Sequence, residues 1–259
     1  MFSPITLLVS ATLVLGQHGS PAPATHGTAQ AKSPNSALSM LMEGNTRFYT
    51  GEKLRPRQSS ERRIETAQNG QKPFASILSC ADSRVPIELI FDVGIGDLFV
   101  VRVAGNVADP AEVGSLEYGV GHLGTPVLVV MGHSKCGAVT AVVTNAKVGG
   151  SIPSFTDNIE PAVEKTRSQN VGASQDALVE KSIKANIWQS VEDIIKSSEE
   201  IRTLIRKNEL KMVGAVYDLE SGKVTNLGVH PRQEQLLKAY GSELLKKPGK
   251  KTTAEAEDL

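Results

Sequence analysis

The chain has 259 residues, of which 40% are hydrophobic and 22% are charged, which suits one globular domain of about 200 residues with terminal extensions. Lysine plus arginine and aspartate plus glutamate both number 28, so the formal net charge at pH 7 is zero. Because the chain has no net positive charge, its charge gives no reason to expect an anionic membrane or a nucleic acid as a partner. We expect no nucleic-acid binding.

An uncharged apolar segment, residues 5–16 (ITLLVSATLVLG), lies close to the N-terminus. It is too short for a membrane-spanning helix, which needs about 20 residues, but it has the length of the hydrophobic region of a signal peptide. Small residues at Ala22 and Ala24 offer a cleavage site. We therefore predict a signal peptide over residues 1–24 and an exported protein, located in the periplasm, outside the cell or in a thylakoid lumen. Because no lysine or arginine precedes the segment, an uncleaved membrane-surface anchor and a wrongly assigned start codon are the alternatives.

The remaining chain divides by composition into three parts. Residues 25–35 are rich in small and polar residues, which predicts a flexible tether. Residues 36–245 carry the apolar segments of a folded domain. Residues 246–259 are charged and contain proline and glycine, which predicts a disordered tail.

Four apolar segments within the domain have the length of strands. They are residues 74–79 (FASILS), 98–103 (LFVVRV), 127–131 (VLVVM) and 211–217 (KMVGAVY). Continuous apolar segments rich in β-branched residues indicate strands buried on both faces, as in a parallel sheet. A turn over residues 218–222 then leads into residues 223–227, which we predict to be an antiparallel edge strand.

Helical patterns fall between the strands. Asp109 is a suitable N-cap, Pro110 suits the first helical position, and we predict a helix from there to about Leu123, before Gly124. Residues 173–207 show helical spacing over a length that predicts an internal break. The alternation predicts an α/β fold with about four parallel strands, an antiparallel edge strand and flanking helices.

The only two cysteines each follow a predicted strand. Cys80 comes directly after residues 74–79, and Cys136 follows residues 127–131 with His133 three positions before it. Ligands gather at the carboxyl ends of parallel strands, so neighbouring strands would bring these side chains together. Two thiolates and one imidazole are the ligand set of a catalytic zinc site with one open position. A disulfide between the two cysteines is the structural alternative in an exported protein.

A carboxylate and a guanidinium group follow Cys80 at short spacing. Arg84 could hold Asp82 through two hydrogen bonds, which would orient the carboxylate and keep it ionised. Asp82 could then accept the proton of a zinc-bound hydroxide. Two alternatives are that Asp82 itself ligates zinc and closes the site, or that the ion pair only ties a loop.

Three sequence blocks resemble the signature blocks of the β-class carbonic anhydrases. They are residues 80–86 (CADSRVP), 102–106 (RVAGN) and 132–137 (GHSKCG). The resemblance extends from about Ser36 to Leu227 and implies reversible hydration of carbon dioxide to bicarbonate and a proton. The zinc ligands that it implies are Cys80, His133 and Cys136, with one ion per chain, and the catalytic dyad is Asp82 and Arg84. Two thiolate ligands lead us to expect activity that rises above neutral pH.

The resemblance also implies a substrate pocket of the plant-type subclass. Gln71 stands nine residues before Cys80, where plant-type members have a glutamine that reaches the substrate across a dimer interface. Phe99 and Tyr118 match two aromatic pocket residues. Ala104 stands where many plant members have a larger aliphatic residue, so we expect a slightly roomier pocket.

His122, four residues after Tyr118, resembles a proposed proton-shuttle histidine, although a surface histidine is an equal alternative. A pocket shared between chains implies a homodimer as the functional unit, with tetramers or larger assemblies left open. Two other functions remain open: hydrolysis of COS or CS2 on the same scaffold, and a zinc-binding protein with a closed site.

Overall fold

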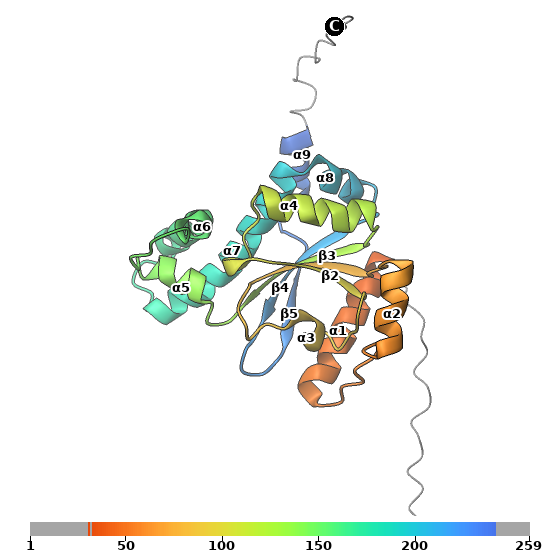
Figure 1. Ribbon diagram of the computed structural model, residues 1–259. Coiled ribbons are helices and arrows are strands. Elements are labelled where there is room, and N and C mark those ends of the chain that lie inside the picture. Colours follow the sequence, from red (N-terminus) through yellow and green to blue (C-terminus); the bar gives the residue numbers. More distant parts are fainter. Residues whose placement is uncertain (1–30, 32, 242–259) are drawn as a thin grey trace, which may run out of the picture.

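The structure is a computed structural model that describes residue 31 and residues 33–241 (Figure 1). The predicted signal peptide, residues 25–30 of the predicted tether and the predicted tail lie outside the described residues. Helix α1 (Pro34–Thr50) begins two residues before the predicted start of the domain, with Ser33 as its N-cap. Among the described helices, none combines the length and the apolar character needed to cross a membrane.

The described residues form one five-stranded sheet in the order β2-β1-β3-β4-β5. The strands are β1 (Ala75–Ser79), β2 (Leu98–Arg102), β3 (Val127–His133), β4 (Lys211–Tyr217) and β5 (Val224–Gly228). The first four pair in parallel, and β5 pairs antiparallel with β4, which confirms the predicted fold class. The prediction that all four parallel strands are buried on both faces is wrong for β2, which is half-exposed because it lies at the edge of the sheet.

Helices cover both faces of the sheet (Figure 1). Besides α1, they are α2 (Ser60–Asn69), α3 (Ile87–Ile90), α4 (Pro110–Glu117), α5 (Gly137–Val143), α6 (Pro153–Gln169), α7 (Gln175–Ser197), α8 (Glu199–Arg206) and α9 (Gln233–Gly241). Two short turns, η1 (Ala104–Asn106) and η2 (Tyr118–His122), complete the described elements. Helices α1 and α3 pack on one face of the sheet, and α4 to α9 pack on the other.

Strand β3 shows how one apolar segment serves both faces. Leu128 and Val130 belong to the apolar cluster under α4 and α7, whereas Val127, Val129 and Met131 belong to the cluster under α1 and α3. Successive side chains of a strand point to opposite faces, so a strand covered on both sides needs an uninterrupted apolar sequence. The central position of β3 therefore brings its carboxyl end, at His133, into a buried environment.

The predicted helix breaks also occur. Helix α4 continues through η2, and the helical path stops at Gly124, whose φ of 70° is the left-handed conformation that glycine favours. The long helical segment divides at Ser198, whose hydroxyl accepts a hydrogen bond from the N–H of Ile201 at 3.1 Å and so caps α8.

Candidate active site

The side chains of Cys80, His133 and Cys136 converge at the carboxyl edge of the sheet. Cys80 follows β1, His133 is the last residue of the neighbouring β3, and Cys136 directly precedes α5. Their ligand atoms lie within 4.8 Å of one another, and all three residues are buried. Both cysteines are free thiols in the structure, which does not contain the alternative disulfide.

The ring of His133 is held in the orientation of a metal ligand. Its Nδ1 lies 2.9 Å from the carbonyl oxygen of Ser134, so Nδ1 carries the proton and donates it to that acceptor. Nε2 is then an unprotonated acceptor, and it is buried with no hydrogen-bond partner among the described residues. A buried nitrogen without a partner calls for a ligand, and a cation between Nε2 and the two sulfur atoms would supply one.

The two thiols influence each other's proton affinity. The hydrogen bond from Cys136 lowers the pKa of Cys80, whereas the neighbouring Cys80 sulfur and burial raise the pKa of Cys136. The backbone N–H of Gly105 also donates to Cys80 Sγ at 3.3 Å. Ionisation of both buried thiols would require a cation to balance the two charges, so the donor set fits a divalent metal with three protein ligands and one open position.

Arg84 binds the carboxylate of Asp82 beside this cluster. Its Nε and Nη2 lie 2.9 Å and 2.7 Å from the two carboxylate oxygens, and its backbone N–H donates to Oδ1 at 2.9 Å. These hydrogen bonds hold the pKa of Asp82 well below its usual range. Asp82 Oδ2 lies 3.8 Å from His133 Nε2, so the ionised carboxylate lies next to the ligand atoms without joining their cluster.

Arg102, for which the sequence suggested no role, holds the loop that carries Cys80 and Asp82. At the end of β2, its Nε donates to the carbonyl of Cys80 at 3.0 Å and its Nη2 donates to the carbonyl of Asp82 at 2.6 Å. The available signals were its position in the 102–106 block and its charge at the end of an otherwise apolar strand. Because both acceptors are main-chain atoms, residue types alone could not identify them.

Helix α7 supports the same region from the side of the core. Asn186 Nδ2 donates to the carbonyl of Gly105 at 2.7 Å, and Ser190 Oγ donates to the carbonyl of Asn106 at 2.9 Å. Gly105 has a φ of 72°, and a Cβ atom there would lie 2.5 Å from Ile159 Cδ1, so only glycine fits. Ala104, the predicted pocket residue, is half-buried immediately before Gly105 and thus near the Cys80 sulfur.

The other predicted site residues lie toward the opposite end of the strands. Phe99 pairs with Ser76 near the start of β1, and its ring centroid is 5.8 Å from that of Tyr118. Tyr118 in turn stacks on His122 at 4.7 Å, and Gln71 is exposed ahead of β1. Strand β1 is about 16 Å long, so one chain does not bring this group to the thiols at its other end.

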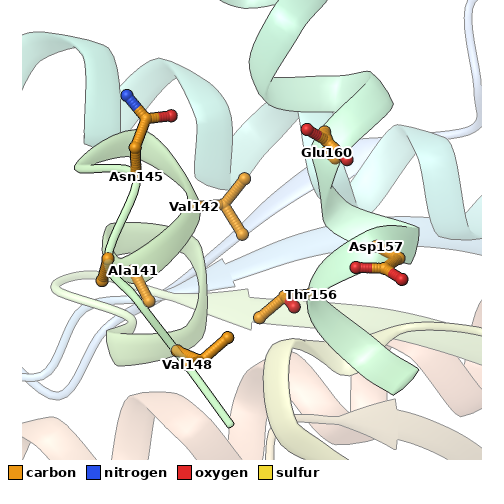
Figure 2. A pocket seen from close by; sticks show the side chains of 8 residues that line it. Ala141, Val142, Asn145, Val148, Thr156, Asp157 and Glu160 are labelled. Atoms are coloured by element: carbon orange, nitrogen blue, oxygen red, sulfur yellow. The ribbon is translucent and has the colours of Figure 1, made fainter. Parts of the chain in front are cut away.

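A cavity of about 250 Å³ lies between α5 and α6 (Figure 2). Asp157 and Glu160 of α6 lie across from Ala141 and Val142 of α5 and from Asn145, which follows α5 (Figure 2). None of its lining residues is a predicted site residue. This cavity is therefore distinct from the cluster of Cys80, His133 and Cys136.

Comparisons with known proteins relate the chain to carbonic anhydrases. The profile of the carbonic anhydrase family matches residues 75–224. Carbonic anhydrase 2 of Mycobacterium tuberculosis is 38% identical over 195 residues, which cover 74% of this chain and 91% of that protein. The crystal structure of the β-carbonic anhydrase CafA from Aspergillus fumigatus matches 81% of this chain and 97% of its own, with 24% identity and a TM-score of 0.64. A tetrameric β-carbonic anhydrase from Sordaria macrospora matches 64% of this chain and 90% of its own, with 23% identity and a TM-score of 0.58.

Proposed function

This chain belongs to the β-class carbonic anhydrase family and is an enzyme of that class, and we propose that it hydrates carbon dioxide reversibly at a zinc ion bound by Cys80, His133 and Cys136. The observation that carries the proposal is the buried convergence of these three ligands beside an ionised Asp82. Zinc, when bound, supplies a Lewis acid that turns water into a nucleophile near neutral pH.

In this proposal, Arg84 orients the carboxylate of Asp82, and Asp82 accepts a hydrogen bond or a proton. Because Arg84 engages both carboxylate oxygens, Asp82 stays ionised and can accept a hydrogen bond or a proton through Oδ2 at the edge of the ligand cluster. Arg102 keeps the backbone of this loop in place through the carbonyls of Cys80 and Asp82. The fourth ligand position is then left for solvent and substrate, not for Asp82.

We further propose that each substrate pocket is shared by two chains, as in the plant-type subclass. The support is the location of Gln71, Phe99 and Tyr118 near the start of β1 and β2, away from the thiols of their own chain. Tyr118 is 45% exposed in a single chain, which suits an aromatic residue that a second copy covers. The homodimer is then the functional unit, and tetramers, as in the Sordaria macrospora enzymes, are a further level of assembly.

Two finer roles complete the proposed pocket. Ala104, next to the glycine whose N–H contacts the Cys80 sulfur, leaves room on the apolar side of the substrate. His122 carries protons outward from the shared pocket. Its support is its exposure and its stacking on Tyr118, because a shuttle needs both solvent access and contact with the pocket.

The decisive experiment measures zinc content and substrate turnover on the same sample. Full-length protein should contain one zinc ion per chain and hydrate carbon dioxide in stopped-flow assays, and Cys136→Ser should lose both. Hydrolysis of COS and CS2 is assayed in parallel, because these linear molecules have the shape of carbon dioxide and would fit the same pocket. Zinc-loaded protein that hydrolyses COS or CS2 but does not hydrate carbon dioxide would overturn the proposal in favour of that alternative. Zinc-loaded protein without any turnover would favour a zinc-binding protein with a closed site.

We also propose export of the protein, on the basis of the apolar segment at residues 5–16 and the small residues at positions 22 and 24. N-terminal sequencing of the protein from its native cells should find a mature end near residue 25. An intact Met1 in the cell interior would contradict export.

A further inference from the structure

A second cavity, of about 440 Å³, lies between α6, α7 and the segment before α9. Three cationic side chains line it: Lys165 of α6, Lys181 of α7 and Arg232. Glu192 is the only carboxylate among the lining residues. The wall therefore carries more positive than negative charge, although the net charge of the whole chain is zero.

The single carboxylate is already engaged. Arg232 forms an ion pair with Glu192, and His230 Nε2 lies 3.2 Å from the same oxygen. His230 Nδ1 accepts the backbone N–H of Arg232 at 3.1 Å, so the ring proton is on Nε2 and is donated to Glu192. With both of these donors directed to it, Glu192 has little capacity left for the two lysines.

Lys165 and Lys181 are left without carboxylate partners. Within residues 33–241, neither side chain forms an ion pair, and Lys181 donates only to the side-chain oxygen of Asn170. The field of these charges reaches the buried His230. Burial lowers the pKa of His230, and Arg232 and Lys165 lower it further against the opposing effect of Glu192. The imidazole is therefore neutral and adds no charge. The excess of positive charge in the cavity comes from Lys165, Lys181 and Arg232 against the single carboxylate of Glu192.

The rest of the wall suits an organic molecule. The indole of Trp188 lines the cavity and is fixed from two sides. It packs on Gly214, where a Cβ atom would come within 2.8 Å of the ring, and it meets His230 edge-on at 5.1 Å. Side-chain amides and a hydroxyl add hydrogen-bonding groups; these are Gln169, Asn170, Gln189 and Thr166. A volume of this size is in the range of small-molecule sites and exceeds what a single inorganic ion fills.

We propose that this cavity binds a small organic anion with at least two negative charges, whose carboxylate or phosphate oxygens accept hydrogen bonds from Lys165, Lys181 and Arg232. The carbon framework of the ligand lies against Trp188. Recognition rests on hydrogen bonds between ionised groups, which are about twice as strong as those between neutral ones. The site is separate from the Cys80, His133 and Cys136 centre and does not depend on the reaction catalysed there.

The chain itself contains the reporter for the test. Trp188 is the only tryptophan, so the intrinsic tryptophan fluorescence of the full-length, zinc-loaded protein reports on this cavity alone. Succinate and inorganic phosphate serve as probes, titrated separately at constant ionic strength against chloride. We expect a saturable fluorescence change with at least one probe. A response to succinate alone or to phosphate alone identifies the group that is recognised.

Charge-reversal variants locate the binding site. Lys165→Glu and Lys181→Glu should each weaken binding of the probe by about tenfold or more, because each removes a charged donor and adds a repelling carboxylate. Lys184→Glu is the matched control, since Lys184 is exposed on the same helix as Lys181 but does not line this cavity. Zinc content is measured after each titration.

Two results would overturn the proposal. One is the absence of a saturable change with either probe. The other is a change whose midpoint is the same in wild type, Lys165→Glu and Lys181→Glu, or one that follows loss of zinc, because the anion would then act elsewhere.

Discussion

The proposed shared pocket makes a prediction about mixtures of an inactive variant, Cys80→Ser, and a weakened variant, Gln71→Ala. Cys80→Ser removes a proposed zinc ligand but leaves Gln71, Phe99 and Tyr118 intact. Gln71→Ala removes the glutamine but leaves the three proposed zinc ligands intact. If each site uses the zinc ligands of one chain and the glutamine of the other, a mixed dimer contains one complete site and one doubly defective site. If each site used its own glutamine, no mixed dimer would contain a complete site.

The structure sets the expected magnitude. Gln71 precedes a strand of five residues that ends before Cys80, a length of about 16 Å, which a glutamine side chain cannot bridge. Loss of its hydrogen bond should lower kcat/KM of the Gln71→Ala homodimer by about tenfold to a hundredfold. In a one-to-one mixture of chains, half of the dimers are mixed and each has one complete site, so activity should recover to about one quarter of the wild-type rate per chain.

The assay is stopped-flow hydration of carbon dioxide on the unfractionated mixture after co-expression and on the mixed dimer isolated through separate affinity tags, which should reach about one half of the wild-type rate per chain because one of its two sites is complete. A mixture of Cys80→Ser with Cys136→Ser is the matched control, because both changes affect the same ligand set and no dimer then contains a complete site. Recovery in this control would show reassembly unrelated to a shared pocket. Failure of the Cys80→Ser and Gln71→Ala mixture to exceed the Gln71→Ala background would refute the shared pocket.

Three further predictions concern the metal, the backbone and pH. His133→Ala should reduce the zinc content from one ion per chain to a small fraction while far-UV circular dichroism is unchanged, and full zinc retention would contradict its role as a ligand. Gly105→Ala should lower the free energy of unfolding by about 2 kcal/mol or more in urea titrations, because φ is 72° and the new Cβ would meet Ile159, whereas Gly149→Ala, with no atom within 4 Å, should have little effect. Burial raises the pKa of Asp92. The Arg47 guanidinium at 2.7 Å and two backbone N–H groups lower the pKa by more than burial raises it, so the net pKa lies below its usual value. A lowered folded pKa stabilises the protein above about pH 4 and loses that contribution as pH falls through the folded value, so Asp92→Asn should reduce stability by about 1–3 kcal/mol at pH 7 and less at pH 3, and an equal loss at both pH values would contradict the ion pair.

The positions of the strands along the chain and the parallel character of four of them followed from local patterns. Continuous apolar segments correctly indicated the four parallel strands, because a strand between two layers of helices has no solvent-facing side. The same pattern could not reveal that β2 lies at the edge, since the order of strands in a sheet depends on pairing between distant segments. The half-exposed β2 is therefore a feature that the sequence pattern alone did not distinguish.

The three candidate metal ligands were also predicted from local information. Cys80 follows β1, His133 ends β3, and Cys136 lies three positions after His133, so these residues need only parallel pairing of β1 and β3 to meet. The Asp82 and Arg84 pair forms within a single loop, so its spacing of two residues sufficed to predict it.

The tertiary structure alone decided the features that depend on contacts between residues far apart in the chain. The side chain of Asn186 donates a hydrogen bond to the carbonyl of Gly105, 81 positions away. Arg102 donates to main-chain carbonyl oxygens, which residue types cannot identify as partners. Gln71, Phe99 and Tyr118 resemble pocket residues in sequence, yet the direction of β1 puts them about a strand length from the thiols of their own chain. The sequence by itself predicted which groups could hold a metal and carry the chemistry, because ligand type and spacing are local. The fold determined which of them meet within one chain, because that depends on strand direction and order.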